Sequence, residues 1–464
     1  MYRLTKEITE RLVPFIDSLA STPVDASHSI SADALKDLRE EIPRTGSELS
    51  SVLDVLFEEA VPPSLSPISG GFMGYVPGGG IFMAALADLI SNTINRYVGA
   101  YPVAPALSEI EADVIRWFAQ IVGFPQESKG FMTSGGSLAN QSAFCVARTV
   151  MCEETFAEAT IYISDQAHQC LSKAARFTGF NANRLRVVRT DSHFRMSTSD
   201  LDVMIQKDRA NGLKPMMIVA TAGTTNTGAV DPLDELATLS ADQNMWFHID
   251  AAYGGFFCLT ERGGAALKGL DRAHSVALDP HKTLFLPYGT GALLVRNGRW
   301  LQETFQEHAD YLPDSSADEG IMDFKDISPE LTRPFRGLRV WLPLKVHGSD
   351  EFAARLDEKL DLAQLVCQHL KADPALEVLA EPELSILAFA CRPNPAETIG
   401  EINNRTKRLL ALINKKNRVH LTGTMLNERF AIRVAIGVYR THQSHIELLF
   451  ADLRTAIEEL EKAV

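Results

Sequence analysis

The sequence predicts an α/β protein whose core is a mostly parallel sheet with helices on both faces, followed by a smaller α+β domain. From residue 130 onward, short apolar segments with strand character alternate with segments of helical periodicity. Residues 215–222 and 245–249 are continuous hydrophobic runs, as expected for strands that are covered on both faces. Repeated β-α-β units form parallel sheets, and their ligands bind where the carboxyl ends of the strands meet.

The composition of the 464-residue chain is that of a globular protein, with 45% hydrophobic and 22% charged residues. A formal net charge of -14 argues against nucleic acid as a partner, because phosphate backbones are bound by basic surfaces. The six cysteines are scattered and form no CxxC pair. This spacing argues against a metal site or a disulfide framework, and it indicates a reducing compartment.

The first residues of the chain do not look like a targeting signal. Glu7 and Glu10 stand where a secretion signal would need an apolar run. The apolar segment 81–90 is interrupted by Asp88 and is too short to span a membrane. We therefore expect a cytoplasmic protein with no membrane partner.

The leading segment, residues 1 to about 62, is expected to be helical, with an apolar stripe at Leu4, Ile8 and Leu12. Such a stripe on a short helix needs a surface to cover, either in its own domain or on a partner subunit. The glycine-rich segment SPISGGFMGYVPGGGIF that follows is expected to be irregular. Two further helices are expected over residues 81–96 and 108–122.

The alternating region contains six expected strands, at residues 159–164, 185–189, 215–222, 245–249, around Val276, and 292–295. Helices are expected between them, up to about residue 151 and over residues 165–179, 198–209 and 232–239. The polar segment 308–333 lacks periodicity and is typical of a lid loop. Beyond residue 348 the pattern is a helix (351–371), strands (376–379, 384–391), a helix (397–414), a strand (430–436) and a closing helix (441–462).

Two polar features fall at expected strand ends. The segment TSGGSLAN opens a helix, where the N–H groups of Gly135, Gly136 and Ser137 could bind a phosphate or simply begin the helix. No Gly-Lys-Ser/Thr follows, so it is not a nucleoside-triphosphate loop. His168 lies just past the strand 159–164, where a histidine is structural or catalytic.

Two charged residues have more unusual surroundings. Asp250 directly follows the apolar run WFHI, where a carboxylate is costly without a cationic or hydrogen-bonding partner. Lys282 lies in DPHK between two apolar segments, where a lysine can lose its proton more readily and act as a nucleophile. A phosphate site, a buried acid and an activated lysine are together what pyridoxal phosphate requires of a protein.

The motifs DPHK, HIDAAYGG, SDQAH, TSGGS and AGTTNTGAVDPL resemble those of the group II pyridoxal-phosphate amino-acid decarboxylases, and the resemblance runs from about residue 66 to 440. It implies the PLP-dependent transferase fold type I, with a seven-stranded sheet. It further implies a large cofactor-binding domain at 66–347 and a small domain at 348–464. The helical segment 1–65 would pack on the partner of a homodimer that shares its active sites.

The resemblance also implies roles for individual residues. Lys282 matches the lysine that forms the Schiff base with the cofactor, and His281 precedes it. Asp250 matches the acid that pairs with the pyridine nitrogen, Ala252 lies at the ring face, and His168 matches the histidine that stacks on the other face.

The remaining cofactor and catalytic positions are implied in the same way. Thr225 matches a residue that hydrogen-bonds near the cofactor. Tyr311, in HADYLPD, falls at the loop tyrosine that donates a proton to the substrate α-carbon. The positions that fall at the family's phosphate site are Gly136, Ser137, Ser275 and Asp279.

The substrate pocket departs from aromatic-selective relatives. Gly99 stands where those relatives place a phenylalanine, and Val76 and Gly78 are smaller than their counterparts. Tyr75 and Tyr101 remain nearby. The resemblance therefore implies substrate-binding residues around a pocket that is roomier or differently shaped. A further departure is Asp279, where the animal aromatic enzyme has asparagine.

The predicted function is decarboxylation of an L-amino acid to the amine and carbon dioxide, with an aromatic or bulky apolar side chain as the first choice. Two alternatives share the cofactor: an aldehyde synthase, which would consume oxygen, and an aminotransferase, which would need a 2-oxo acid. An alternative of another class is a binding protein that keeps the fold without turnover.

Overall fold

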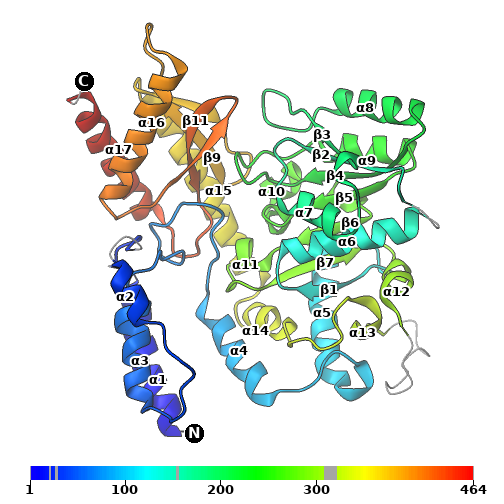
Figure 1. Cartoon of the computed structure of the whole chain (residues 1–464), viewed down its shortest axis with the longest axis horizontal. Helices are drawn as coiled ribbons and strands as arrows, with labels where there is room; N and C mark the ends of the chain where they lie inside the picture. The colour runs from blue at the N-terminus through cyan, green and yellow to red at the C-terminus, as the bar shows by residue number, and fades with distance from the viewer. Residues whose placement is uncertain (1, 20–21, 27–29, 153–155, 308–320, 463–464) are drawn as a thin grey trace. The chain divides into compact units, whose positions relative to one another are not determined.

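A computed structural model describes residues 2–19, 22–26, 30–152, 156–307 and 321–462 (Figure 1). The chain forms two compact units, one of residues 1–77, 373–377 and 390–464, the other of residues 78–372 and 378–389. The domain boundaries expected after residues 65 and 347 differ from this division, and they stay a prediction.

The second unit contains a seven-stranded sheet in the order β1-β7-β6-β5-β4-β2-β3. Its strands are β1 Lys129–Thr133, β2 Ala159–Ser164, β3 Leu185–Val188, β4 Lys214–Thr221, β5 Trp246–Asp250, β6 Ser275–Leu278 and β7 Gly291–Val295. The pairs from β6 through β5, β4 and β2 to β3 are parallel, and β7 is antiparallel to both β1 and β6. The predicted fold class is confirmed.

Both faces of this sheet are covered, because every residue of β2, β5, β6 and β7 is buried. Helix α6 packs against β1, β5, β6 and β7, while α8 and α9 pack against β4. The α-helices of the unit are α4 Phe82–Ile94, α5 Pro105–Val122, α6 Gly136–Met151, α7 Cys170–Phe177, α8 Thr198–Ala210, α9 Leu233–Asp242, α10 Glu261–Ala266, α11 Pro280–Thr283, α12 Arg299–Phe305, α13 Phe324–Ile327, α14 Gly337–His347 and α15 Ser349–Ala372. Short 3-10 helices add η2 Tyr101–Val103, η3 Ala182–Arg184, η4 Gly255–Leu259 and η5 Leu270–Arg272.

The topology brings four polar segments to one edge of the sheet. Strands β2, β4, β5 and β6 are consecutive parallel neighbours, so their carboxyl ends meet. His168 follows β2, Thr225 follows β4, Asp250 is the last residue of β5, and Asp279 links β6 to α11. The apolar runs of the sequence predicted strand-end positions for His168 and Asp250, whereas Thr225 and Asp279 were implied by the family resemblance.

The first unit carries the ends of the chain. Its helices are α1 Tyr2–Ser18, α2 Ala32–Asp37, α3 Leu49–Asp54, the π-helix η1 Val55–Ala60, α16 Ile399–Lys415 and α17 Gln443–Glu461. A four-stranded sheet has the order β10-β11-β9-β8, and the division between the units runs through β8 and β9. Its strands are β8 Leu376–Ala380, β9 Ile386–Cys391, β10 Thr422–Leu426 and β11 Arg429–Ala435.

One strand of this sheet is absent from the sequence prediction. Strand β10 forms an antiparallel hairpin with β11, joined by Asn427 and Glu428 alone. Both linking residues have positive φ, 46° and 68°, as two-residue hairpin turns of type I′ require. Asparagine is common at the first of these positions but glutamate is rare at the second, so the segment lacks the Asn-Gly pair that usually marks such a turn.

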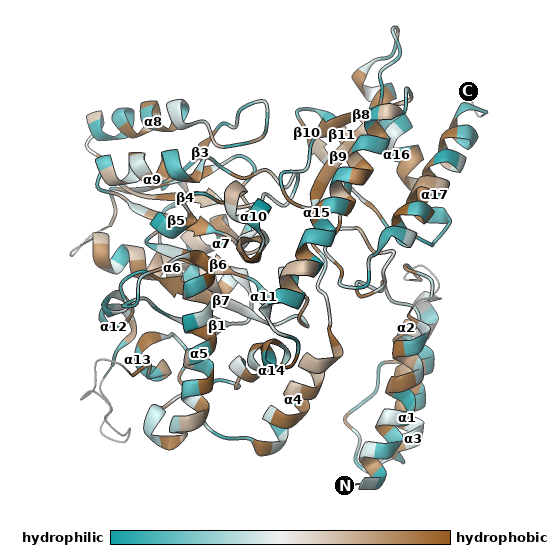
Figure 2. Cartoon of the chain, turned by 180° about the vertical axis from the view of Figure 1, so that it is seen from behind, coloured by the Kyte–Doolittle hydropathy of each residue, from teal (hydrophilic) through white to brown (hydrophobic). Residues whose placement is uncertain are grey.

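Helix α1 has no fully buried residue, and its apolar residues range from partly buried, as Leu12 is, to exposed. Leu4 and Ile8, two members of the predicted stripe, are 43% and 39% exposed. Figure 2 shows apolar and polar colours alternating along α1 and α3. In the described part of the chain, no helix combines the length and apolar character needed to cross a bilayer.

Candidate active site

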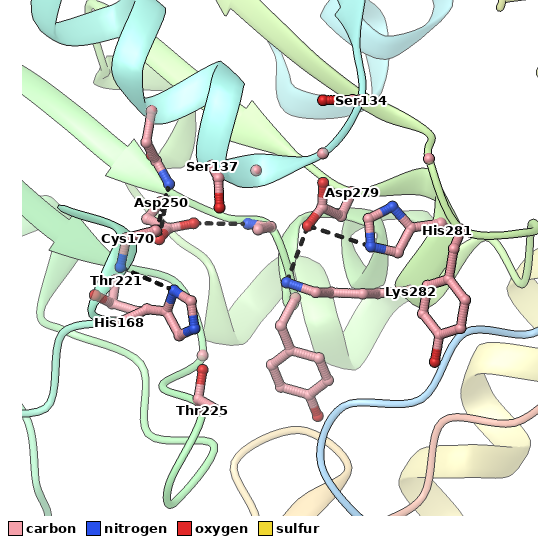
Figure 3. Close-up of a pocket in the computed structure, with 18 residues that line it drawn as sticks. Ser134, Ser137, His168, Cys170, Thr221, Thr225, Asp250, Asp279, His281 and Lys282 are labelled. Carbon is pink, nitrogen blue, oxygen red and sulfur yellow. Dashed lines mark hydrogen bonds and ion pairs between the residues drawn. The ribbon is translucent and has the colours of Figure 1, made fainter. Parts of the chain in front are cut away.

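A cavity of about 530 Å³ lies in the second unit, at the edge where the parallel strands end (Figure 3). It is lined by Ser134, Gly135, Gly136, Ser137, Asn140, His168, Cys170, Thr221, Gly223, Thr225, Asp250, Ala252, Tyr253, Asp279, His281, Lys282, Tyr288 and Gly289. Apart from Ser275, all the cofactor-binding positions predicted from the sequence are in this set.

Asp250 is 5% exposed and is held by two hydrogen bonds. Its Oδ2 accepts the side-chain amide of Asn140 at 3.1 Å, and its Oδ1 accepts the backbone N–H of Ala252 at 3.2 Å. Burial raises the pKa of Asp250, whereas the charge of Lys282 and the Ala252 N–H act to lower it. The carboxylate therefore has the partners that its burial demands, and it still lines the cavity.

Lys282 is an ion-paired ammonium, contrary to the expectation of a readily deprotonated amine. Its Nζ lies 2.9 Å from Asp279 Oδ2. Burial acts to lower the pKa of Lys282, but the charges of Asp279 and Asp250 outweigh it and raise the pKa. The apolar residues that flank Lys282 in the sequence predicted a lowered pKa. They give no sign of the two carboxylates that neighbouring strands bring close to the amine. Neutralising either acid would make the amine easier to deprotonate.

Burial disfavours the charged form of two histidines in the cavity. Burial lowers the pKa of His168, whose Nδ1 accepts the backbone N–H of Cys170 at 3.3 Å. Burial also lowers the pKa of His281, whose Nδ1 donates to the carbonyl of Thr290 at 2.7 Å. Lys282 is the one lysine or arginine among the described residues that line the cavity.

The start of α6 lines one end of the cavity and is its candidate anion-binding site. The N–H groups of Gly136 and Ser137 lie in the first helical turn, where no acceptor exists within the helix. A Cβ at Gly136 would lie 3.0 Å from both Ala252 Cβ and Asp279 Oδ2, so a larger residue would be tightly packed against these two side chains. Asp279 is 2% exposed, and its Oδ1 is buried without a hydrogen-bond partner.

These residues fit pyridoxal phosphate. Asp250 can face a pyridinium nitrogen, Lys282 can bind the aldehyde carbon, and Gly136 with Ser137 can hold the phosphate. The unpartnered Oδ1 of Asp279 is an acceptor that a bound group with a proton to donate would satisfy.

Ser275 is the cofactor-binding prediction that does not agree with the structure. It is fully buried within β6 and does not line the cavity. Its hydroxyl accepts the indole N–H of Trp246 at 2.9 Å and lies 2.8 Å from His248 Nδ1. Because these buried contacts occupy the hydroxyl, we do not retain Ser275 as a phosphate ligand.

None of the predicted substrate-binding residues lines the cavity. Tyr75 and Val76 belong to the first unit. Gly78 donates its N–H to the hydroxyl of Tyr288 at 3.3 Å, and Tyr288 does line the cavity. Tyr101 is a partly buried residue whose N–H bonds to a side chain outside the cavity lining.

The environment of Gly99 does not support a roomier pocket at that position. A Cβ there would lie 2.5 Å from the carbonyl oxygen of Leu331 and 2.9 Å from the ring of Tyr97. Backbone and ring atoms of these neighbours therefore fill the space that a side chain at position 99 would occupy. Tyr311, the predicted proton donor, lies outside the described residues.

Several lining residues escaped the sequence prediction, above all Asn140. It lies four residues after Gly136 in α6, which places both on one face of the helix. Tyr288 and Cys170 also line the cavity. The helical spacing from Gly136 is the signal that could have found Asn140, whereas Cys170 and Tyr288 carried no such spacing.

A pyridoxal-phosphate-dependent enzyme is the class that this fold and cavity define. The profile of the family described as "Pyridoxal-dependent decarboxylase conserved domain" matches residues 38–392 of the chain. The chain belongs to this family, and it is therefore a pyridoxal-phosphate-dependent carboxy-lyase that decarboxylates an amino acid.

Two curated relatives align along nearly the whole chain. The aromatic-L-amino-acid decarboxylase of Bacillus atrophaeus is 34% identical over 462 residues, which cover 99% of this chain and 96% of the relative. Tyrosine decarboxylase 2 of Narcissus pseudonarcissus is 28% identical over 465 residues, which cover 95% of this chain and 91% of the relative.

Two solved structures have the same fold. Oryza sativa TDC with PLP and tryptamine gives a TM-score of 0.92 at 24% identity, covering 98% of each chain. Catharanthus roseus tryptophan decarboxylase in complex with L-tryptophan gives 0.91 at 24% identity, covering 99% of each chain. At this identity the likeness concerns the fold.

The ion pair between Lys282 and Asp279 predicts how the protein takes up its cofactor. Asp279→Asn removes a charge that raises the pKa of Lys282, so more of the amine is neutral at a given pH. We expect the midpoint of the pH dependence for covalent uptake of pyridoxal phosphate to fall by about one pH unit or more. The uptake rate is followed by absorbance after the cofactor is added to cofactor-free protein.

Asp326→Asn is the matched control, because Asp326 pairs with Lys325 at 2.7 Å and does not line the cavity. It should leave the midpoint unchanged. An Asp279→Asn protein with the wild-type midpoint would show that Asp279 does not control Lys282.

Proposed function

We propose that this enzyme decarboxylates an aromatic L-amino acid to the amine, with Lys282, Asp250 and His168 as catalytic residues. The observation that carries the proposal is that these side chains line one cavity at the carboxyl edge of the sheet. An amine, a buried carboxylate and a flat neutral ring are the groups that pyridoxal-phosphate chemistry asks of a protein.

When bound, pyridoxal phosphate supplies a ring that accepts the electron pair left on the substrate α-carbon as carbon dioxide departs. In our proposal the Asp250 carboxylate holds a proton on the ring nitrogen, and Lys282 Nζ binds the cofactor covalently. His168 offers a neutral ring surface, since its burial disfavours the charged form. In the same proposal, Ala252 and Thr225 border the cofactor, and His281 and Asp279 lie near its phosphate group.

Two observations support an aromatic substrate. The Bacillus atrophaeus relative, 34% identical along 99% of this chain, is an aromatic-L-amino-acid decarboxylase. The cavity lining includes Tyr253 and Tyr288, and it includes no arginine among the described residues. A substrate with an acidic side chain would need such a cation, so it is disfavoured.

We also infer a homodimer in the cytoplasm, with active sites shared between the subunits. The exposed apolar residues of α1, together with Val52 and Leu56 at 53% and 46% exposure, form a surface that a second copy would cover. The six cysteines are free thiols, as is usual in a reducing compartment. Light scattering that gives the mass of one chain would contradict the dimer.

The first test is a screen of the common amino acids for release of carbon dioxide by the cofactor-loaded enzyme. We expect the highest kcat/KM for L-tryptophan, L-tyrosine or L-phenylalanine, and at least about a hundredfold less for L-glutamate, because its charge lacks a partner. Lys282→Ala should abolish turnover of every substrate. A Lys282→Ala protein with normal turnover, or a preference for glutamate, would contradict the proposal.

Tyr311 is proposed as the donor of a proton to the substrate α-carbon, on the ground of its family resemblance. Tyr311→Phe removes only the hydroxyl, so binding should persist while amine formation falls. We expect about a hundredfold less amine and the appearance of aldehyde with oxygen uptake. Amine and aldehyde are measured by chromatography beside an oxygen electrode. Unchanged amine output would remove Tyr311 from the mechanism.

A further inference from the structure

A row of polar side chains continues from Asp250 into the interior, behind the cavity. Side chains alternate along a strand, so Trp246, His248 and Asp250 of β5 lie on the same face. Strand β6 places Ser275 directly opposite His248, and α6 packs Asn140 against this face. All of these side chains are at most 5% exposed, and His248, Asn140 and Ser275 are fully buried.

The row is connected by hydrogen bonds without a gap. Trp246 Nε1 lies 2.9 Å from Ser275 Oγ, which lies 2.8 Å from His248 Nδ1. His248 Nε2 lies 2.7 Å from Asn140 Oδ1, and Asn140 Nδ2 lies 3.1 Å from Asp250 Oδ2. The second hydrogen of the Asn140 amide points to the sulfur of Cys170, at 3.5 Å.

The chemistry of the groups fixes where each proton sits near Asp250. A carboxylate only accepts, so Asn140 turns its NH₂ toward Asp250 and its carbonyl toward His248. A carbonyl also only accepts, so His248 carries its proton on Nε2. A second proton, on Nδ1, would make a charged imidazolium in a fully buried place, and burial lowers the pKa of His248 to about 3.

At the other end of the row, His248 Nδ1 has two neighbours, the Ser275 hydroxyl at 2.8 Å and the Ser275 backbone carbonyl at 3.1 Å. A carbonyl only accepts, so this assignment takes the nearer hydroxyl as the partner of Nδ1. The indole N–H of Trp246 can only donate, so it occupies a lone pair of the Ser275 hydroxyl. The hydroxyl proton is then free to be donated to the bare Nδ1 of His248. Every donor in the row thus points in one direction, from Trp246 toward the Asp250 carboxylate.

We propose that His248 and Asn140 are positioning residues, which hold Asp250 as an oriented anion at the cavity through a one-way row of hydrogen bonds. The proposal rests on the proposed function, because it takes Asp250 as the partner of the cofactor's ring nitrogen. Lys282 also favours the anion, but only while its amine is charged. The Asn140 amide donates its hydrogen bond whether or not Lys282 is charged, so it stabilises the Asp250 anion in both states of Lys282.

The clearest test compares two amides in place of the imidazole. In His248→Gln, the longer side chain can bring an N–H to the position of Nε2 and keep the bond to Asn140. In His248→Asn, the amide reaches only the position of Nδ1, so Asn140 loses its donor. We expect kcat to fall roughly 10- to 100-fold in His248→Asn, with KM little changed, and to recover most of that loss in His248→Gln.

A measurement on the wild-type, cofactor-free protein tests the row without relying on turnover. Nitrogen NMR of histidine-labelled protein should show His248 as the neutral tautomer with its proton on Nε2, without titration between about pH 5 and 8. The resonance is assigned by its loss in His248→Gln. A proton on Nδ1, or a titrating ring, would overturn the proposal even if His248→Asn fails to fold.

The outcomes also separate this proposal from the proposed function. Equal kcat in His248→Asn and His248→Gln would refute the positioning role, although Lys282→Ala remained inactive. Normal turnover in Lys282→Ala would refute the proposed function, whereas the tautomer of His248 would still stand as measured.

Discussion

A carboxylate removed from water needs hydrogen-bond donors or a counter-charge. The rest of this site depends on how the protein supplies such partners to the buried carboxylate of Asp250. The Asn140 amide and the Ala252 N–H donate hydrogen bonds to this carboxylate, and Lys282 supplies a positive charge near it. Each partner comes from a different element, respectively α6, the turn after β5 and α11. The sheet topology is what brings these elements together.

The charges of the cavity explain why a cationic ring belongs there. Asp250 and Asp279 are two acids whose charges both act on one ammonium, Lys282, while burial lowers the pKa of His168 and of His281. A pyridinium facing Asp250 would restore the balance and free Lys282 from one of the two charges that raise its pKa. Cofactor binding and activation of the lysine are then linked through the same carboxylate.

The amino-acid sequence is informative where the chemistry is local to a strand end. The strands are apolar runs long enough to recognise, so the order of residues is enough to place His168, Asp250 and Lys282 at one edge of the sheet. The turn at Asn427 and Glu428 escapes prediction because glutamate is unusual at positive φ, although asparagine is common there.

Contacts between elements could not be predicted in the same way. The raised pKa of Lys282 depends on Asp279 and Asp250 meeting it in space. The surroundings of Gly99 depend on the distant Leu331, and the buried contacts of Ser275 depend on Trp246 and His248. The alternation of Trp246, His248 and Asp250 along β5 is visible in the sequence. The hydrogen-bonded link between His248 and Asp250 is not, because Asn140 of α6 makes it.

The most direct test of the central claim, that Asp250 pairs with the ring nitrogen, is the affinity of cofactor-free protein for two ligands. One is pyridoxal phosphate, and the other is its deaza analogue, in which carbon replaces the ring nitrogen. If Asp250 holds that nitrogen, the wild-type protein prefers pyridoxal phosphate by roughly 10- to 100-fold, and Asp250→Ala abolishes the preference. Equal affinities in the wild type, or the same preference in both proteins, would contradict the claim.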